Sequence, residues 1–160
     1  MARVYLGLGS NIDPENNLRL GVAALRDSYG NLDISPVYKN AAVGFEGPDF
    51  LNLVVGLDSD DSPTRIQACI ERIHKQAGRH RGEEKLASRP LDIDLLLYDD
   101  LVLEDPPLPR SDVLDYAFVL QPLADLAPDV VHPISGQTIA EHWQAFGAAR
   151  HPMTLVDVIL

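Results

Sequence analysis

The order in which strand and helix patterns follow one another limits the fold of this chain more than any other feature. A strand pattern is a short run of apolar and branched residues between turn residues, whereas a helix pattern repeats apolar residues every three or four positions. These patterns predict strands at residues 3–8, 34–43, 51–57 and 91–98, and helices at residues 14–25 and 64–76. The predicted order is therefore strand, helix, strand, strand, helix, strand.

This order is that of the ferredoxin-like arrangement, so we predict an α+β fold with helices on one face of an antiparallel sheet. Residues beyond 98 form a C-terminal extension, in which prolines at positions 106, 107 and 109 mark irregular chain. Helical patterns return in part of residues 113–126 and at residues 139–146. A length of 160 residues fits one ordinary domain, which we place at residues 1–160.

The charge of the chain is acidic overall but unevenly distributed. There are 13 Lys and Arg residues against 24 Asp and Glu residues, a net charge of −11, which argues against general nucleic-acid binding. Six of the 13 cationic residues lie within residues 72–89. Such a concentration indicates either a local anion site or a solvated charged loop, and composition alone does not choose between them.

The sequence also carries expectations about the setting of the protein. It contains no apolar run long enough to cross a membrane and no secretory-signal pattern at its start. Its single cysteine, Cys69, cannot form an intramolecular disulfide, which agrees with a reducing compartment. We therefore expect a cytoplasmic protein, monomeric, that binds neither nucleic acid nor membrane.

The most informative chemistry lies in the last predicted strand. Alternate side chains of a strand share a face, so Asp92 and Asp94 point the same way, with Cα atoms about 6.6 Å apart. The opposite, apolar face suits the core and consists of Leu91, Ile93, Leu95 and Leu97. Two adjacent carboxylates repel one another, and a divalent cation such as Mg²⁺ relieves that repulsion. With Arg89 nearby to bind phosphate, the pattern indicates phosphoryl transfer. The alternative is that both acids only solvate an exposed sheet face.

Several segments, in order along the chain, resemble the motifs of one enzyme family, the 6-hydroxymethyl-7,8-dihydropterin pyrophosphokinases of folate synthesis. Residues 85–96 are similar to the family signature, and residues 5–11 to its opening strand and turn. The other similar segments are residues 49–52, 78–81 and 118–123. The resemblance covers most of the chain. It implies Mg²⁺-dependent transfer of diphosphate from ATP to the hydroxymethyl group of a reduced pterin, with release of AMP.

The resemblance also implies a role for each matching residue. Asp92 and Asp94 would hold two Mg²⁺ ions that bridge the ATP phosphates. Phe50 and Phe118 would stack on the two faces of the pterin ring. Asn52 would pair with the amide edge of the pterin, because its side chain has both a donor and an acceptor.

Basic residues would serve the nucleotide. Arg79 and Arg89 would clamp phosphates and steady the transferred group. Arg81 and Lys85, in a long polar loop, would close over the site and exclude water. Arg110 would supply a further positive charge to ATP.

Among the positions that depart from the family pattern, three leave alternatives open. His74 stands where a glutamate is usual, Arg110 where a histidine is usual, and Tyr116 where an arginine is frequent. A tyrosine does not replace the bidentate phosphate contact of an arginine. One alternative is therefore a diverged paralogue with altered substrate or weak catalysis. Another is a ferredoxin-like ligand-binding module without chemistry.

Overall fold

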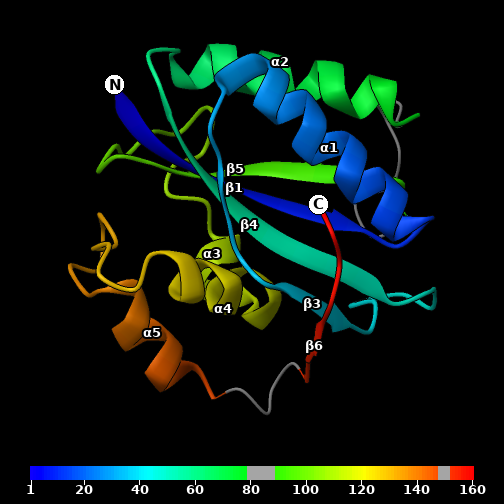
Figure 1. Ribbon diagram of the computed structural model, residues 1–160. Coiled ribbons are helices and arrows are strands. Elements are labelled where there is room, and N and C mark those ends of the chain that lie inside the picture. The colour runs from blue at the N-terminus through cyan, green and yellow to red at the C-terminus, as the bar shows by residue number, and fades with distance from the viewer. Residues whose placement is uncertain (79–88, 148–151) are drawn as a thin grey trace.

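An antiparallel six-stranded sheet forms the centre of the computed structural model, which describes residues 1–78, 89–147 and 152–160 (Figure 1). The strands are β1 (Ala2–Ser10), β2 (Asp33–Ile34), β3 (Val37–Asn40), β4 (Phe50–Ser59), β5 (Asp92–Tyr98) and β6 (Thr154–Val156). Their order is β5-β1-β4-β3-β6, and β2 also pairs with β4. Because every pairing is antiparallel, the predicted ferredoxin-like sheet is confirmed.

Two helices cover one face of this sheet, as the sequence predicts (Figure 1). They are α1 (Pro14–Tyr29) and α2 (Pro63–Gln76), and each begins with a proline, whose missing N–H costs nothing at a first helical position. The Ser62 side chain caps α2 by accepting a hydrogen bond from Arg65 N. Leu18 of α1 and Ile66 of α2 are fully buried in the core beneath. Burial of each such side chain contributes about 1.5–3 kcal/mol.

The C-terminal extension forms a second layer on the opposite face. Its helices are α3 (Asp112–Asp115), α4 (Ala117–Leu126) and α5 (Ile139–Phe146). The predicted helix at 113–126 is divided because Tyr116 has extended backbone angles, φ −129° and ψ 129°. Leu120 of α4 and Ile139 of α5 join Val54 of the sheet in a second buried cluster. Among the described residues, no helix combines the length and apolar character needed to cross a bilayer.

A bulge in β5 changes the face on which its later side chains lie. Tyr5 pairs with Leu97 and Leu6 pairs with Leu95, so Leu96 has no opposite residue in β1. Leu96 and Leu97 both belong to the second cluster, whereas Leu95 belongs to the first. The prediction that Leu97 continues the face of Leu95 is therefore wrong, because one inserted residue shifts the alternation.

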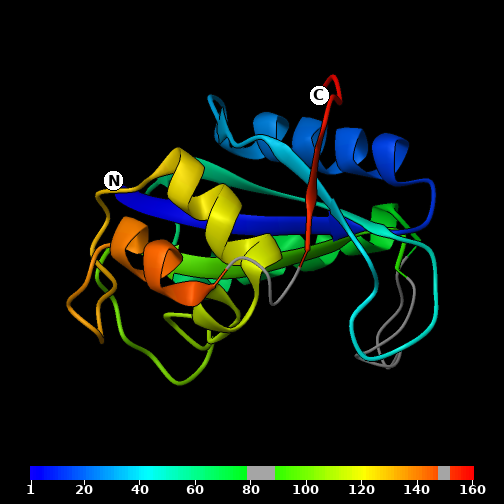
Figure 2. The same ribbon diagram turned by 90° about the horizontal axis from the view of Figure 1, so that it is seen from below.

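The strand predicted at residues 34–43 is two short strands. Pro36 lies between β2 and β3 and has no N–H to donate to a ladder. Ser35 maintains the contact with β4 across this break: its Oγ accepts a hydrogen bond of 2.8 Å from Val54 N. The last strand, β6, lacks a strong sequence pattern and returns to the sheet to pair with β3 (Figure 2).

Candidate active site

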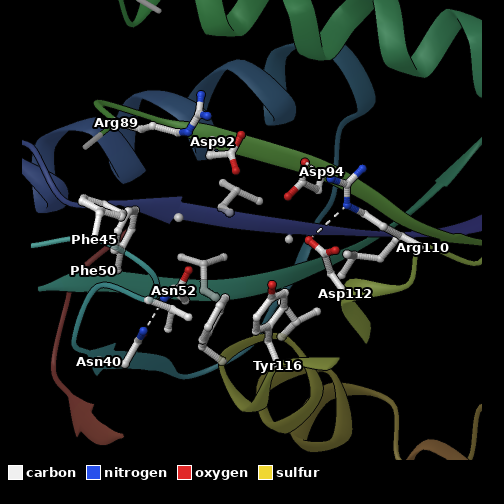
Figure 3. A pocket seen from close by; sticks show the side chains of 18 residues that line it. Asn40, Phe45, Phe50, Asn52, Arg89, Asp92, Asp94, Arg110, Asp112 and Tyr116 are labelled. Atoms are coloured by element: carbon white, nitrogen blue, oxygen red, sulfur yellow. Dashed lines mark hydrogen bonds and ion pairs between the residues drawn. The ribbon is translucent and has the colours of Figure 1, made fainter. Parts of the chain in front are cut away.

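A pocket of about 200 Å³ opens on the sheet face that carries the C-terminal layer (Figure 3). Its lining comes from β1, the end of β3, β4 and β5, from the segments that precede β4 and β5, and from the start of the C-terminal layer. Seven predicted site residues lie in this lining, namely Phe50, Asn52, Arg89, Asp92, Asp94, Arg110 and Phe118. The other three, Arg79, Arg81 and Lys85, fall outside the described residues.

Bare main chain of β1 forms the floor of the pocket. Gly7 and Gly9 both line it. A Cβ on Gly9 would lie 2.6 Å from Asn52 Oδ1, which is closer than real Cβ contacts, and one on Gly7 would lie 3.4 Å from Leu96 Cδ1. Because Gly9 has no side chain, the Asn52 amide can extend across the strand and a flat ligand can approach the backbone.

Two carboxylates stand along one wall of the pocket. Asp92 pairs with Gly9 and Asp94 with Gly7 in the register of β5 on β1, so both side chains project beside the floor (Figure 3). Ile93 between them is buried in the first core. The predicted common face of the two acids is therefore confirmed.

Arg110 brings a positive charge to the same wall. Its Nη2 lies 3.4 Å from Asp94 Oδ1, and its Nε donates to Asp112 Oδ2 at 3.2 Å. Burial lowers the pKa of Arg110, but the charges of Asp94 and Asp112 outweigh burial and raise it above its ordinary value. Asp112 is a further carboxylate of the pocket, not predicted from the sequence. The spacing Arg110-Ser111-Asp112, directly after irregular proline-rich chain, was the available signal.

The turn after β1 positions Arg89, whose side chain is only 5% exposed. Arg89 N donates to Asn11 Oδ1 at 2.7 Å, and Asn11 N donates to the Arg89 carbonyl at 3.1 Å. Asn11 Nδ2 also donates to the Pro48 carbonyl at 3.1 Å. Ser10 Oγ donates to the Pro90 carbonyl. The turn at Ser10 and Asn11 therefore holds two segments in place: the main chain that leads into β5 and the main chain that leads into Phe50 of β4.

His74 supports the acidic wall from the opposite side of the sheet. This buried residue of α2 accepts a 2.8 Å hydrogen bond at Nε2 from Ile93 N, the peptide group between the two aspartates. Its Nδ1 lies 3.7 Å from Glu71 Oε1. The histidine that departs from the family pattern thus tethers β5 at the place where the two carboxylates project.

Aromatic rings gather at the other side of the floor. Phe50 meets Phe45 edge to face, with ring centroids 6.2 Å apart and an interplanar angle of 88°. Phe118 stacks on Tyr116, with centroids 4.9 Å apart and planes inclined by 20°. Phe45 and Tyr116 were not predicted as site residues, although both line the pocket. Each predicted aromatic therefore has a second ring that fixes its plane.

The donor groups suit a hard divalent cation that is shared with a ligand. Asp92 and Asp94 offer carboxylate oxygens on one wall, and Mg²⁺ commonly takes one or two carboxylates and completes its shell with water and phosphate oxygens. Within the described ranges, no three or more His, Cys, Asp or Glu residues converge as a closed metal site. The residues therefore fit Mg²⁺ bound together with a phosphate ligand, rather than a structural metal.

Comparison with known proteins identifies similar sequences. A sequence model described as 7,8-dihydro-6-hydroxymethylpterin-pyrophosphokinase (HPPK) matches residues 5–128. The 2-amino-4-hydroxy-6-hydroxymethyldihydropteridine pyrophosphokinase of Aquifex aeolicus is 34% identical over 145 residues, 88% of this chain and 90% of the relative. The protein of the same name from Synechocystis is 38% identical over 142 residues, 85% of this chain and 72% of the relative.

Solved structures show a similar fold. The Plasmodium falciparum HPPK-DHPS wild type with pterin and p-hydroxybenzoate superposes with a TM-score of 0.75 over 92% of this chain, at 14% identity. The wild type with pteroate gives a TM-score of 0.73 at 13% identity. This chain spans only 43% and 42% of those two chains. At this identity the likeness concerns the fold alone.

Proposed function

Because the chain belongs to the 7,8-dihydro-6-hydroxymethylpterin-pyrophosphokinase family, we propose how the residues of its pocket carry out the reaction of that family. The chain is a pyrophosphokinase of folate synthesis that acts on 6-hydroxymethyl-7,8-dihydropterin. We propose that ATP donates the diphosphate to the hydroxymethyl group and AMP is released, that the reaction requires Mg²⁺, and that each pocket residue has the role given below.

One observation supports the proposal most strongly. The acidic wall with Asp92 and Asp94 faces an aromatic and amide wall with Phe50 and Asn52 across a floor of backbone (Figure 3). A flat polar ring suits the aromatic side, and a charged polyphosphate suits the side with metal ligands and arginines. A hydroxymethyl group on the ring would then lie toward the phosphates.

At the aromatic side, we assign the reduced pterin to the space beside Phe50 and Phe118. Their ring planes are set by Phe45 and Tyr116, so little side-chain freedom is lost when the ligand stacks. Asn52 would hydrogen-bond the amide edge of the pterin. The residue is 8% exposed, so its amide is already largely desolvated before a ligand arrives.

At the phosphate side, Asp92 and Asp94 would hold Mg²⁺, and two ions are expected. When bound, the metal would neutralise charge on the phosphates and align them. Arg89 and Arg110 would bind phosphate oxygens, and positive charge there would stabilise the transition state. The pterin hydroxyl oxygen would attack the β-phosphorus of ATP. A bond forms between the pterin hydroxyl oxygen and the β-phosphorus, and the hydroxyl loses its proton. The bond from the β-phosphorus to the oxygen that bridges it to the α-phosphorus breaks, and AMP leaves with that oxygen.

Three further roles stay predictions from the sequence. Arg79 would clamp phosphate as a catalytic residue, and Arg81 and Lys85 would bind the nucleotide. Single substitutions to alanine with measurement of the KM for ATP would test them, since loss of a phosphate contact raises that KM or lowers kcat.

The deciding experiment measures AMP formation from ATP and 6-hydroxymethyl-7,8-dihydropterin, with and without a chelator. We expect AMP only when both pterin and metal are present. Asp92→Asn and Asp94→Asn should each reduce kcat about 100-fold or more, because each removes a negative oxygen ligand that acts on the transition state. Asp100→Asn is the matched control, an exposed aspartate just beyond β5, and should stay within about twofold of the parent chain.

Near-normal turnover by Asp92→Asn would contradict the assigned mechanism. Turnover that the chelator does not reduce would contradict the metal requirement. The diverged paralogue is tested by a panel of hydroxymethyl substrates and nucleotides, in which the dihydropterin and ATP should be preferred. The non-catalytic module predicts binding without AMP, and the relatives of 34–38% identity do not favour it.

The domain organisation, oligomeric state, cellular compartment and absence of macromolecular partners also stay predictions. We expect one domain over residues 1–160, a monomer in the cytoplasm, and no binding to nucleic acid or membrane. The net charge of −11 supports the absence of nucleic-acid binding. Sedimentation analysis and cell fractionation would test the oligomeric state and the compartment.

A further inference from the structure

Two buried asparagines meet at the aromatic side of the pocket. Asn40, at the end of β3, is 6% exposed, and Asn52 of β4 is 8% exposed. Both line the cavity, and Asn52 Nδ2 donates a 2.6 Å hydrogen bond to Asn40 Oδ1 (Figure 3). Asn40 Nδ2 in turn donates to the Ala41 carbonyl at 3.0 Å. A short hydrogen-bond chain thus runs from the main chain to the cavity.

These hydrogen bonds allow only one orientation of each side-chain amide. The Ala41 carbonyl can only accept, so it must face the NH₂ group of Asn40, and the Asn40 oxygen must face Asn52. That oxygen also can only accept, so Asn52 must present its NH₂ group to Asn40. The two ends of an isolated amide are nearly equivalent in shape, but here the partners distinguish them.

The oxygen of Asn52 is correspondingly held on the opposite side. Oδ1 lies 2.6 Å from the position that a Gly9 Cβ would occupy, so it extends over the bare floor of the pocket. A ligand that lies on this floor therefore meets the acceptor of Asn52 and its remaining N–H in a fixed order. An amide that could flip would present either order at little cost.

We propose that Asn40 is a specificity-determining positioning residue, which fixes the Asn52 amide so that the pocket selects a 4-oxo over a 4-amino pteridine. The proposal rests on the proposed function. The lactam edge of a 4-oxo pteridine places an N–H donor beside a carbonyl acceptor. A 4-amino pteridine reverses this order, with a ring-nitrogen acceptor beside an NH₂ donor. A fixed Asn52 amide pairs with the 4-oxo edge. Against the 4-amino edge, its donor would face a donor and its acceptor would face an acceptor.

Substitutions at Asn40 separate an orienting role from a purely structural one. Asn40→Leu removes the acceptor for Asn52, and Asn40→Ser replaces it with a hydroxyl that can donate as well as accept. In both variants the Asn52 amide is free to turn. Asn40→Asp retains an acceptor and keeps the amide direction, although it loses the donor to Ala41. Val119→Ala, on another part of the lining, is the matched control, because it removes apolar contact without touching either asparagine.

The experiment measures the affinity of each protein for 6-hydroxymethylpterin and for 2,4-diamino-6-hydroxymethylpteridine by calorimetry. The parent chain should prefer the 4-oxo compound about tenfold or more, the scale of one mismatched buried polar pair. In Asn40→Leu and Asn40→Ser the preference should fall to about threefold or less, with the KM for ATP unchanged. Asn40→Asp and Val119→Ala should keep the preference of the parent chain, even where both affinities fall.

The outcomes are distinguishable. If Asn40→Leu weakens both compounds equally and keeps their ratio, the pair is only structural and the inference is wrong. If Asn40→Leu does not fold, as judged by thermal unfolding, Asn40→Ser decides the question. If the parent chain binds both compounds equally, the inference fails while the proposed function stands. If it binds neither compound and releases no AMP, the proposed function itself fails.

Discussion

Single side chains in this protein act through the main chain as much as through direct contact with a ligand. His74 is the clearest case, because its side chain on α2 accepts a hydrogen bond from the peptide N–H of Ile93 in the edge strand β5. That N–H lies between two side chains that must project together into the pocket. A buried N–H without an acceptor is expensive, so the histidine contributes both stability and position.

Removal of this acceptor gives a prediction at the residue scale. His74→Phe should lower the free energy of unfolding by about 1–3 kcal/mol, because the Ile93 N–H stays buried without a partner. His74→Gln places an amide oxygen near the position of Nε2 and should recover most of that loss. Urea unfolding of the three proteins tests this, and equal stability of the Phe and Gln variants would contradict it.

The residues that the sequence could predict are those with a local signature. Asp92 and Asp94 show it by their spacing within one strand, and Phe50 and Asn52 by the short motif that contains them. Asn40 has no such signature, and the only local sign of Asp112 is its place two residues after Arg110. Their roles depend on partners in other elements, Asn52 for the first and Arg110 for the second, and neither hydropathy nor period records such pairings.

At the scale of elements, the loop that precedes α5 is held by one buried histidine. His132 Nδ1 accepts from Ile134 N at 3.3 Å and from Ser135 N at 3.2 Å. Its ring centroid lies 5.6 Å from that of His142. Burial lowers the pKa of His132, and the neighbouring His142 lowers it further. The neutral ring is therefore the form that the folded loop requires.

This shift predicts how stability depends on pH. Because the pKa of His132 is lower in the folded chain than its ordinary value of about 6.5, the unfolded chain binds the proton more readily. The contribution of neutral His132 to the free energy of unfolding is complete above about pH 6.5. It is lost as the pH falls toward the pKa of His132 in the folded chain. His132→Asn keeps an acceptor near Nδ1 but does not titrate. Between about pH 7.5 and 5.5, the melting temperature of the parent chain should fall more than that of the variant. Parallel curves would contradict this.

Elements were predicted well where their pattern was local. The ranges of α2 and α5 agree with the sequence patterns at residues 64–76 and 139–146. The bulge at Leu96 was not predicted, because a run of three leucines gives no sign of where alternation changes. β6 was missed for a related reason: it has only three residues and depends on pairing with β3.

At the scale of the whole molecule, one sheet separates two apolar cores that support different parts of the structure. The core under α1 and α2 supports the sheet, whereas the core under α4 also holds the segment that carries Tyr116 and Phe118. A hydrogen bond from the Tyr38 hydroxyl to Asp125 joins β3 to α4, and burial together with this bond raises the pKa of Tyr38. The ferredoxin-like order of strands and helices along the chain was predictable, but the proline-rich chain after β5 gave no sign that the extension would cover the opposite face of the sheet.

This division predicts different effects of one substitution in the two cores. Leu18→Ala in α1 and Leu120→Ala in α4 remove equally buried side chains, 0% and 1% exposed. Each should cost about 2–5 kcal/mol of stability. Only Leu120→Ala should also raise the KM for the pterin, because it loosens the helix that begins beside the aromatic pair. Steady-state kinetics well below both melting temperatures tests this, and equal pterin KM values would refute it.

The bare strand beneath the pocket has a consequence for inhibition. A compound whose affinity comes from lying flat on Gly9 touches peptide atoms, which every substitution leaves in place. The one change available there adds a side chain, and that side chain would meet Asn52 Oδ1 at 2.6 Å. Such a change displaces the amide that we assign to pterin binding. An organism under selection by such a compound therefore gains resistance at this surface only by giving up the activity that the resistance was meant to protect.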